Sequence, residues 1–186
     1  MSNDRFRFLP IQFGDASRAW TRACQGIDPP DLAFGPEWRQ PRPRAGEKYF
    51  LIWDDHHPAQ GRTCGDGPVG LLFVTWPSET TVSFGMGLWA ECRGQGLGPT
   101  VRDAIYAFLF SDLAIHKLES QVYSSNGQSL GALHGQHSRS RLEGRQLESI
   151  RIGAAFYDRL LFGITRDEWE AENGGNSRPP PDTVPR

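Results

Sequence analysis

The stretch that decides the fold is VSFGMGLWAECRGQGLGPT, which runs from Val82 to Thr100. From Val82 to Leu88, bulky apolar residues alternate with serine and glycine, a period-two pattern typical of a strand with one buried face. Three glycines follow within five positions, and the pattern changes again at Leu97. The stretch therefore predicts a strand that leads through a glycine-rich turn into a helix.

The helix after this turn is predicted by apolar residues at intervals of three and four, with its N-terminus within 93–98. These residues are Leu97, Val101, Ile105, Phe108 and Leu109. Glycines let the backbone approach a ligand, the first helical turn offers unpaired N–H groups, and the helix dipole adds partial positive charge. The junction favours an anion such as a pyrophosphate, and Arg93 is expected to add a full positive charge.

Two other phosphate-binding motifs are excluded. The Walker A motif requires Gly-Lys followed by Ser or Thr, and no lysine lies near this turn. A formal GxGxxG occurs at Gly65, Gly67 and Gly70, but it contains Pro68, precedes a strand and opens no helix, so the dinucleotide-binding context is missing. We interpret it as a turn.

Strands and helices alternate in the rest of the chain. Strands are predicted at Phe6–Ile11, Tyr49–Trp53, Val69–Trp76, Leu118–Tyr123, Leu142–Ile152 and Ala155–Ile164. Helices are predicted at Asp15–Cys24 with Asp15 as N-cap, at Ser129–His137, and in a last turn with the capping-box pair Thr165 and Glu168. Five prolines between 26 and 46 predict a loop, either a lid over the substrate or a plain surface loop.

The fold class expected from this order is α/β (α+β): one domain with a mixed, mostly antiparallel sheet of about six or seven strands, flanked by helices. The domain is expected to span 1–171. A tail rich in proline and glycine, 172–186, has almost no apolar residue to bury and is expected to be mobile.

The composition indicates which classes of partner the protein binds and in which cellular compartment it is expected. With 20 basic and 22 acidic residues the net charge is −2, which argues against nucleic acid. No apolar run approaches the ~18 residues of a membrane span, and the first residues have no signal-peptide core. The cysteines are odd in number and lack Cys-x-x-Cys spacing, which argues against a disulfide framework. A cytoplasmic protein without membrane contact is expected.

No metal site is predicted. His56, His57 and Cys64 lie in a polar stretch without a fourth ligand at the usual spacing. His134 and His137 lie three apart, so a metal-binding or proton-shuttling pair stays open beside ordinary exposed histidines. Cys92 is interpreted as a small residue at a strand end, with a reactive thiol beside Arg93 as the alternative.

The glycine-rich turn also resembles a known motif. Arg93, Gly96 and Gly98 match the Arg/Gln-x-x-Gly-x-Gly/Ala acyl-CoA motif of the GNAT superfamily of N-acetyltransferases. Asn126 and Ser129 resemble the Asn-x-x-Ser of the branch that acetylates ribosomal-protein N-termini. The segments 143–145 and 156–169 are similar to that branch's ending. The resemblance covers about residues 6 to 170, with its specific motifs after Leu88.

The chain departs from the family at two places. His137-Ser138 stands where the family usually has Gly-Phe, and Leu133 stands where many relatives in other branches carry a tyrosine. The His137-Ser138 departure, together with the lack of a clearly defined base, keeps a non-catalytic acyl-CoA sensor open as an alternative. A protein that binds another phosphate ligand through the same loop is a third.

The resemblance implies acetyl-CoA as the cofactor and direct attack of a primary amine on the thioester, the amine being a protein N-terminus or a small molecule. Asn126 and Ser129 are implied to hold the cofactor, with a helix cap as the alternative, and Ser129 to protonate the leaving thiolate. The implied cofactor-binding residues are Leu88, Trp89, Ala90, Arg93, Gly94, Gln95, Gly96, Leu97, Gly98, Thr100, Asn126 and Ser129.

The amine has to be neutral to attack. Deprotonating a lysine-type amine near neutral pH costs roughly 4 kcal/mol, against roughly half a kcal/mol for an α-amine. The sequence singles out no base among Glu79, Glu91, Glu148 and Asp158. This favours an N-terminal or small-molecule amine over an internal lysine. The acyl chain, the base and the oligomeric state, a homodimer included, stay open.

Overall fold

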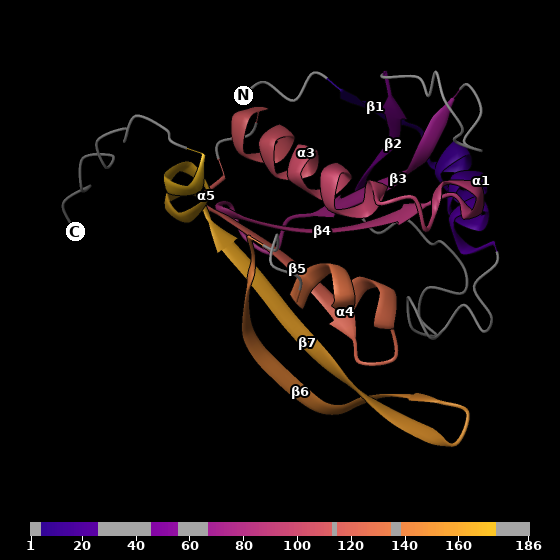
Figure 1. Ribbon diagram of the computed structural model, residues 1–186, viewed down its shortest axis with the longest axis vertical. Helices are drawn as coiled ribbons and strands as arrows, with labels where there is room; N and C mark the ends of the chain where they lie inside the picture. The colour runs from indigo at the N-terminus through magenta and orange to yellow at the C-terminus, as the bar shows by residue number, and fades with distance from the viewer. Residues whose placement is uncertain (1–4, 26–45, 56–66, 113–114, 135–138, 174–186) are drawn as a thin grey trace.

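A seven-stranded sheet with helices on both faces is the framework of the protein (Figure 1). The computed structural model describes residues 5–25, 46–55, 67–112, 115–134 and 139–173. The strands are β1 (Phe6–Ile11), β2 (Lys48–Asp54), β3 (Pro68–Thr75), β4 (Thr81–Leu88), β5 (Lys117–Tyr123), β6 (Arg141–Ile152) and β7 (Ala155–Thr165). Their order is β1-β2-β3-β4-β5-β7-β6. The predicted fold class is confirmed.

The helices lie where the sequence changes to helical periodicity, with differences at their ends. They are α1 (Phe13–Cys24), the short 3₁₀ turn η2 (Ala90–Cys92), α3 (Leu97–Asp112), α4 (Gly127–His134) and α5 (Arg166–Glu172). Asp15 was expected to cap α1, and this is wrong. The N-cap is Gln12, and Asp15 lies within the first turn of the helix, where its carboxylate pairs with Arg18.

The capping box at the start of α5 is confirmed. The Thr165 hydroxyl accepts the backbone N–H of Glu168, and the Glu168 carboxylate accepts the backbone N–H of Thr165 at 2.8 Å. The bonds that the Glu168 carboxylate accepts from the Thr165 backbone N–H and from the Thr165 hydroxyl lower the pKa of Glu168. The predicted start of α4 at Ser129 is two residues late, because the helix already begins at Gly127.

The sheet divides between β4 and β5, the one parallel pair in it. These two strands are paired only at Thr81–Ser83 with Lys117–Glu119. Beyond that point β4 stays bonded to β3 as far as Leu88, and β5 stays bonded to β7 as far as Tyr123. The two halves of the sheet therefore diverge below the glycine-rich turn, as Figure 1 shows.

Aromatic contacts fix α1 and α3 on opposite faces of the first half. On one face, Trp20 of α1 meets Phe73 of β3 edge-on, with ring centroids 5.6 Å apart. The Phe73 ring covers Gly85, where an added Cβ atom would lie 2.0 Å from the ring, so no larger residue fits at this position. On the other face, Phe108 of α3 stacks on Phe8 of β1 at 4.7 Å.

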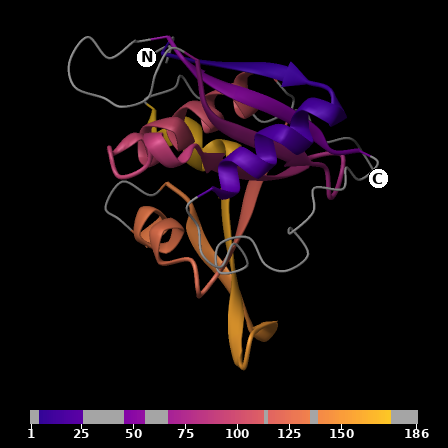
Figure 2. The same cartoon turned by 90° about the vertical axis from the view of Figure 1, so that its right-hand side faces the viewer.

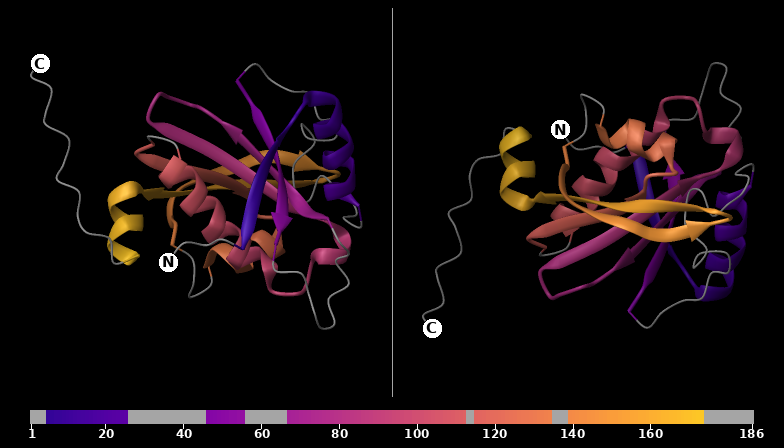
Figure 3. Two further views of the ribbon diagram at one scale, coloured as in Figure 1. Left: turned by 90° about the horizontal axis from the view of Figure 1, so that it is seen from above. Right: turned by 90° about the horizontal axis from the view of Figure 1, so that it is seen from below.

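The second half of the sheet continues into the β6–β7 hairpin, which extends away from the rest of the molecule (Figure 2). A small second core, Val122, Leu133 and Phe162, lies between α4 and this half. Helices α1 and α5 lie at opposite ends of the molecule (Figure 3).

Several expectations lie outside the described residues. They concern most of the loop 26–46, His56, His57, Cys64, His137, Ser138 and nearly all of the tail 172–186. None of the helices in the described part combines the length and hydrophobicity needed to cross a bilayer.

Candidate acyl-CoA site

The turn between β4 and α3 is an open cradle of backbone. Gly94 and Gly96 have φ values of 71° and 73°, in the left-handed region that favours glycine. A Cβ added at Gly94, Gly96 or Gly98 would meet no atom within 4 Å, so the backbone there borders open space. The first turn of α3 contains no acidic residue. Free N–H groups, positive helix dipole and open backbone together fit a diphosphate.

Arg93 is bonded differently from the expectation that it faces the phosphates. Its Nε donates to the Leu88 carbonyl at 3.0 Å and its Nη1 to the Gln25 carbonyl at 2.7 Å. Its Nη2 donates to the Ala23 carbonyl. Burial lowers the pKa of this guanidinium, against the smaller opposing effects of Cys24 and Glu91. The side chain fastens the C-terminus of α1 to the start of the loop.

A second contact between α1 and the turn lies on the outside. Arg22 forms an ion pair with Glu91 in η2, and its guanidinium lies over the Trp89 ring, 5.1 Å from the centroid. The ion pair lowers the pKa of Glu91. The end of α1 is therefore part of the structure that holds the cradle in place.

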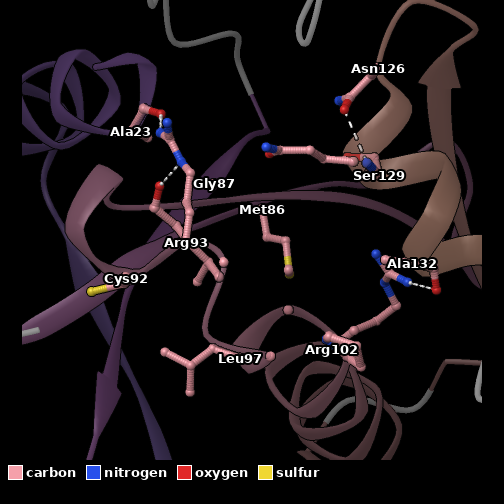
Figure 4. A pocket seen from close by; sticks show the side chains of 16 residues that line it. Ala23, Met86, Gly87, Cys92, Arg93, Leu97, Arg102, Asn126, Ser129 and Ala132 are labelled. Carbon is pink, nitrogen blue, oxygen red and sulfur yellow. Dashed lines mark hydrogen bonds between the residues drawn. The ribbon is translucent and has the colours of Figure 1, made fainter. Parts of the chain in front are cut away.

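A cavity of about 340 Å³ opens beside the cradle, within the size range of small-molecule sites (Figure 4). It lies between α3 and α4, over the end of β4. The predicted residues that line it are Leu88, Arg93, Gly94, Gly96, Leu97, Gly98, Asn126 and Ser129. It is also lined by Ala23, Met86, Gly87, Cys92, Pro99, Arg102, Gln128 and Ala132.

Four of the predicted cofactor-binding residues do not line this cavity. Trp89 is buried in the core with 1% exposed, and Gln95 turns back to donate to the Glu91 carbonyl at 2.6 Å. Ala90 belongs to the 3₁₀ turn and Thr100 to the body of α3. The side chains of Trp89 and Gln95 therefore face the protein and not the cavity, which leaves binding of a ligand by these two residues to their backbone.

A smaller cavity, of about 80 Å³, lies where β4 and β5 diverge. It is lined by Phe73, Phe84 and Gly85 on one side and by Ser120, Gln121 and Val122 on the other. The two cavities share four wall residues, which are Met86, Arg102, Asn126 and Ser129. These four residues therefore lie between the cradle and the gap in the sheet.

Asn126 and Ser129 are brought together at this shared wall. The Asn126 Oδ1 accepts the backbone N–H of Ser129 at 3.0 Å, which is a helix-cap bond at the start of α4 (Figure 4). The cap does not exclude a role in the site, because both residues line both cavities.

Arg102 was missed by sequence reasoning. It is 9% exposed, lies in α3 among buried residues and borders both cavities. The signal was present, since a charged residue beside Val101 and Ile105 interrupts the apolar part of an amphipathic helix.

The cysteine expectation needs a correction. Cys92 lines the larger cavity and is disulfide-bonded, so it is not a reactive thiol. The expectation of no disulfide, based on the odd number of cysteines, is therefore wrong. Cys24 is a free thiol, and burial raises its pKa to about 11. In the described residues no three histidine, cysteine or acidic side chains gather as a metal site.

The chain resembles known proteins in part of its sequence and in its fold. No family model matches the chain. A curated relative, the SPbeta prophage-derived uncharacterized N-acetyltransferase YokL of Bacillus subtilis, is 31% identical over 94 residues, which cover 50% of this chain and 52% of the relative. The chain thus matches about half the length of that protein.

Solved structures are similar over nearly the whole chain. The spermidine N-acetyltransferase of Vibrio cholerae in complex with CoA and spermine has a TM-score of 0.68 at 14% identity, covering 89% of this chain and 98% of that one. The chain has the GNAT fold. The spermidine/spermine N-acetyltransferase of Vibrio cholerae in complex with manganese ions has a TM-score of 0.63 at 15% identity, covering 95% of this chain and 100% of that one.

Proposed function

We propose that this protein is an acetyl-CoA-dependent N-acetyltransferase that transfers an acetyl group to a primary amine by direct attack on the thioester. The observation that carries the proposal is the open backbone cradle at the N-terminus of α3, beside a cavity that shares four wall residues with the cavity between β4 and β5. In the proposal the anionic diphosphate of the cofactor lies at the cradle, and its arm runs along this shared wall toward the gap in the sheet.

In this proposal the backbone N–H groups of 94–98 hold the diphosphate, and Pro99, the next residue, has no N–H to donate. The thioester carbonyl is polarised by a backbone N–H near Leu88, at the free end of β4. Acetyl-CoA supplies the activated acyl group when bound. Asn126 and Ser129 hold the cofactor arm, and the Ser129 hydroxyl donates its proton toward the leaving sulfur.

The acceptor is proposed to be an amine that loses its proton easily. Among the described residues, neither cavity is lined by aspartate, glutamate or histidine. Two of the bases considered from the sequence are occupied: Glu91 pairs with Arg22, and Asp158 accepts from Arg145 and from the Glu148 backbone. These contacts lower the pKa of both carboxylates and make them weak bases. An α-amine therefore suits the site better than a lysine.

Two acceptor classes remain in the proposal. A protein N-terminus is what the similarity of Asn126 and Ser129 to the ribosomal-protein branch favours. The Vibrio structures favour a small amine, since those proteins are named as N-acetyltransferases of spermidine and spermine. The described walls contain Arg93 and Arg102 and no carboxylate, which disfavours a polycation.

The proposal is tested by thiol release from acetyl-CoA with a panel of amines. The panel contains a short peptide with a free N-terminus, the same peptide acetylated at its N-terminus with an internal lysine left free, and spermidine. We expect turnover with the first and little with the others. Binding of CoA without turnover of any amine would favour a sensor. A rise in melting temperature with ATP and none with CoA would refute the acyl-CoA site.

A further inference from the structure

Arg102 is a buried cation without a carboxylate partner in the described residues. It is 9% exposed, and its Nη1 donates to the Ala132 carbonyl of α4 at 2.8 Å. A guanidinium stays protonated and has five N–H donors, so one hydrogen bond satisfies little of it. Burial of such a group is costly unless an anion or several acceptors compensate it.

The side chain lies where the two cavities meet. It extends from α3 toward α4 (Figure 4) and shares the common wall with Met86, Asn126 and Ser129. In the proposed function, the arm of a cofactor whose diphosphate lies at the glycine cradle runs along this wall toward the gap between β4 and β5. The reactive end of the arm therefore comes close to the guanidinium.

The charges around this wall leave it positive. Met86 of β4, Ser120 and Gln121 of β5, Ser129 of α4 and Asn126, which directly precedes α4, carry no charge. The titratable groups that act on Arg102 from its own helix are Tyr106 and Asp103. The Asp103 Oδ1 lies 3.4 Å from the Arg139 Nε, so Arg139 partly neutralises the Asp103 carboxylate. Burial raises the pKa of Tyr106, which keeps its phenol neutral.

We propose that Arg102 is a catalytic residue that stabilises the thiolate sulfur leaving acetyl-CoA. This inference rests on the proposed function. As the amine nitrogen bonds to the carbonyl carbon, the carbon–sulfur bond breaks and its electron pair stays on sulfur. The proton lost by the nitrogen goes to water, and the guanidinium remains protonated. With this cation beside the sulfur, Ser129 needs only to donate a hydrogen bond, which suits a weakly acidic hydroxyl better than full proton transfer.

The test uses CoA itself, which carries the same sulfur as a thiol. Calorimetry gives its affinity between pH 6.5 and pH 9.5, with desulfo-CoA as the matched control ligand. If the guanidinium favours the thiolate, the thiol of bound CoA has a lower pKa than the thiol of free CoA. The affinity then rises with pH from the bound pKa to the free pKa, about tenfold for each unit of lowering. Desulfo-CoA lacks the thiol and shows no such rise.

Two variants separate catalysis from support of α4. Arg102→Met keeps an unbranched side chain without charge, and we expect it to lose the pH-dependent difference between CoA and desulfo-CoA. Arg102→Lys keeps the charge, and we expect it to retain part of the pH-dependent difference in affinity between CoA and desulfo-CoA. If Arg102→Met lowers only the melting temperature and keeps the difference, Arg102 merely caps α4 and the inference is wrong.

The wild-type protein gives a decision even where the variants fail to fold. Equal pH profiles for CoA and desulfo-CoA in the wild type overturn the role of Arg102 and leave the acyl-CoA site standing. Failure of both ligands to bind at any pH overturns the proposed function and this inference with it.

Discussion

Arg93 is expected to hold the cradle in place more than it binds the cofactor, and Arg93→Met tests this. The variant removes three hydrogen bonds to the carbonyls of Leu88, Gln25 and Ala23. Bonds from a charged donor contribute roughly 1.5–3 kcal/mol each when buried. Because this side chain is partly exposed, we take about 1 kcal/mol for each and expect a loss of about 3 kcal/mol in the free energy of unfolding.

The loss is measured by urea denaturation and thermal melting without cofactor. For a domain of this size it corresponds to a drop in melting temperature of roughly 6–12 °C. Arg18→Met is the matched control, because Arg18 lies on the same helix α1 and its ion-pair partner in the described part of the chain is the exposed Asp15. The control should change stability by less than about 0.5 kcal/mol.

The variant also separates the two roles that Arg93 can have. Under our interpretation CoA affinity falls moderately, and its salt dependence is the same in the wild type and in Arg93→Met. Unchanged stability together with a strong loss of CoA affinity and a smaller salt dependence would show that Arg93 binds phosphate directly. That result would refute the argument from its hydrogen bonds.

Four further predictions concern single positions. Gly96→Val forces a branched residue into a left-handed φ of 73° and fills the cradle, so we expect a loss of about 1–3 kcal/mol in stability and of most CoA affinity, against little change in stability for Gly98→Ala; unchanged CoA affinity in the first would contradict the cradle. Cys24, with its pKa raised to about 11, should react with iodoacetamide at pH 8 on the order of two hundredfold more slowly than a free thiol, as peptide mass spectrometry can measure. Asp158 accepts from the Glu148 N–H and from Arg145, which lowers its pKa, so Asp158→Asn should destabilise the protein near neutral pH, with a difference in urea melts that shrinks as the pH falls below about 4; a constant difference would exclude this linkage. Thr165→Ala removes the capping bond to Glu168 and should cost about 1 kcal/mol in urea unfolding, whereas a neutral effect would mean that α5 contributes nothing to global stability.

The sequence by itself determined what depends on near neighbours. The alternation up to Leu88, the change of period at Leu97 and the pair Thr165 and Glu168 each act within one turn or a few residues, so the strand, the helix and the cap follow from them. Local rules failed at Asp15, where a good capping residue lies inside the helix and Gln12 takes the cap position without a side-chain bond.

Only the tertiary structure decided which distant groups meet. Arg93 reaches carbonyls 68 and 70 residues away, and no local pattern encodes such a distance. The gap between β4 and β5 arises because each strand keeps its outer partner, and Arg102 meets Ala132 only because α3 and α4 flank that gap. The sequence thus located the cradle for the diphosphate, whereas packing placed the cation and the space in which the chemistry is proposed to occur.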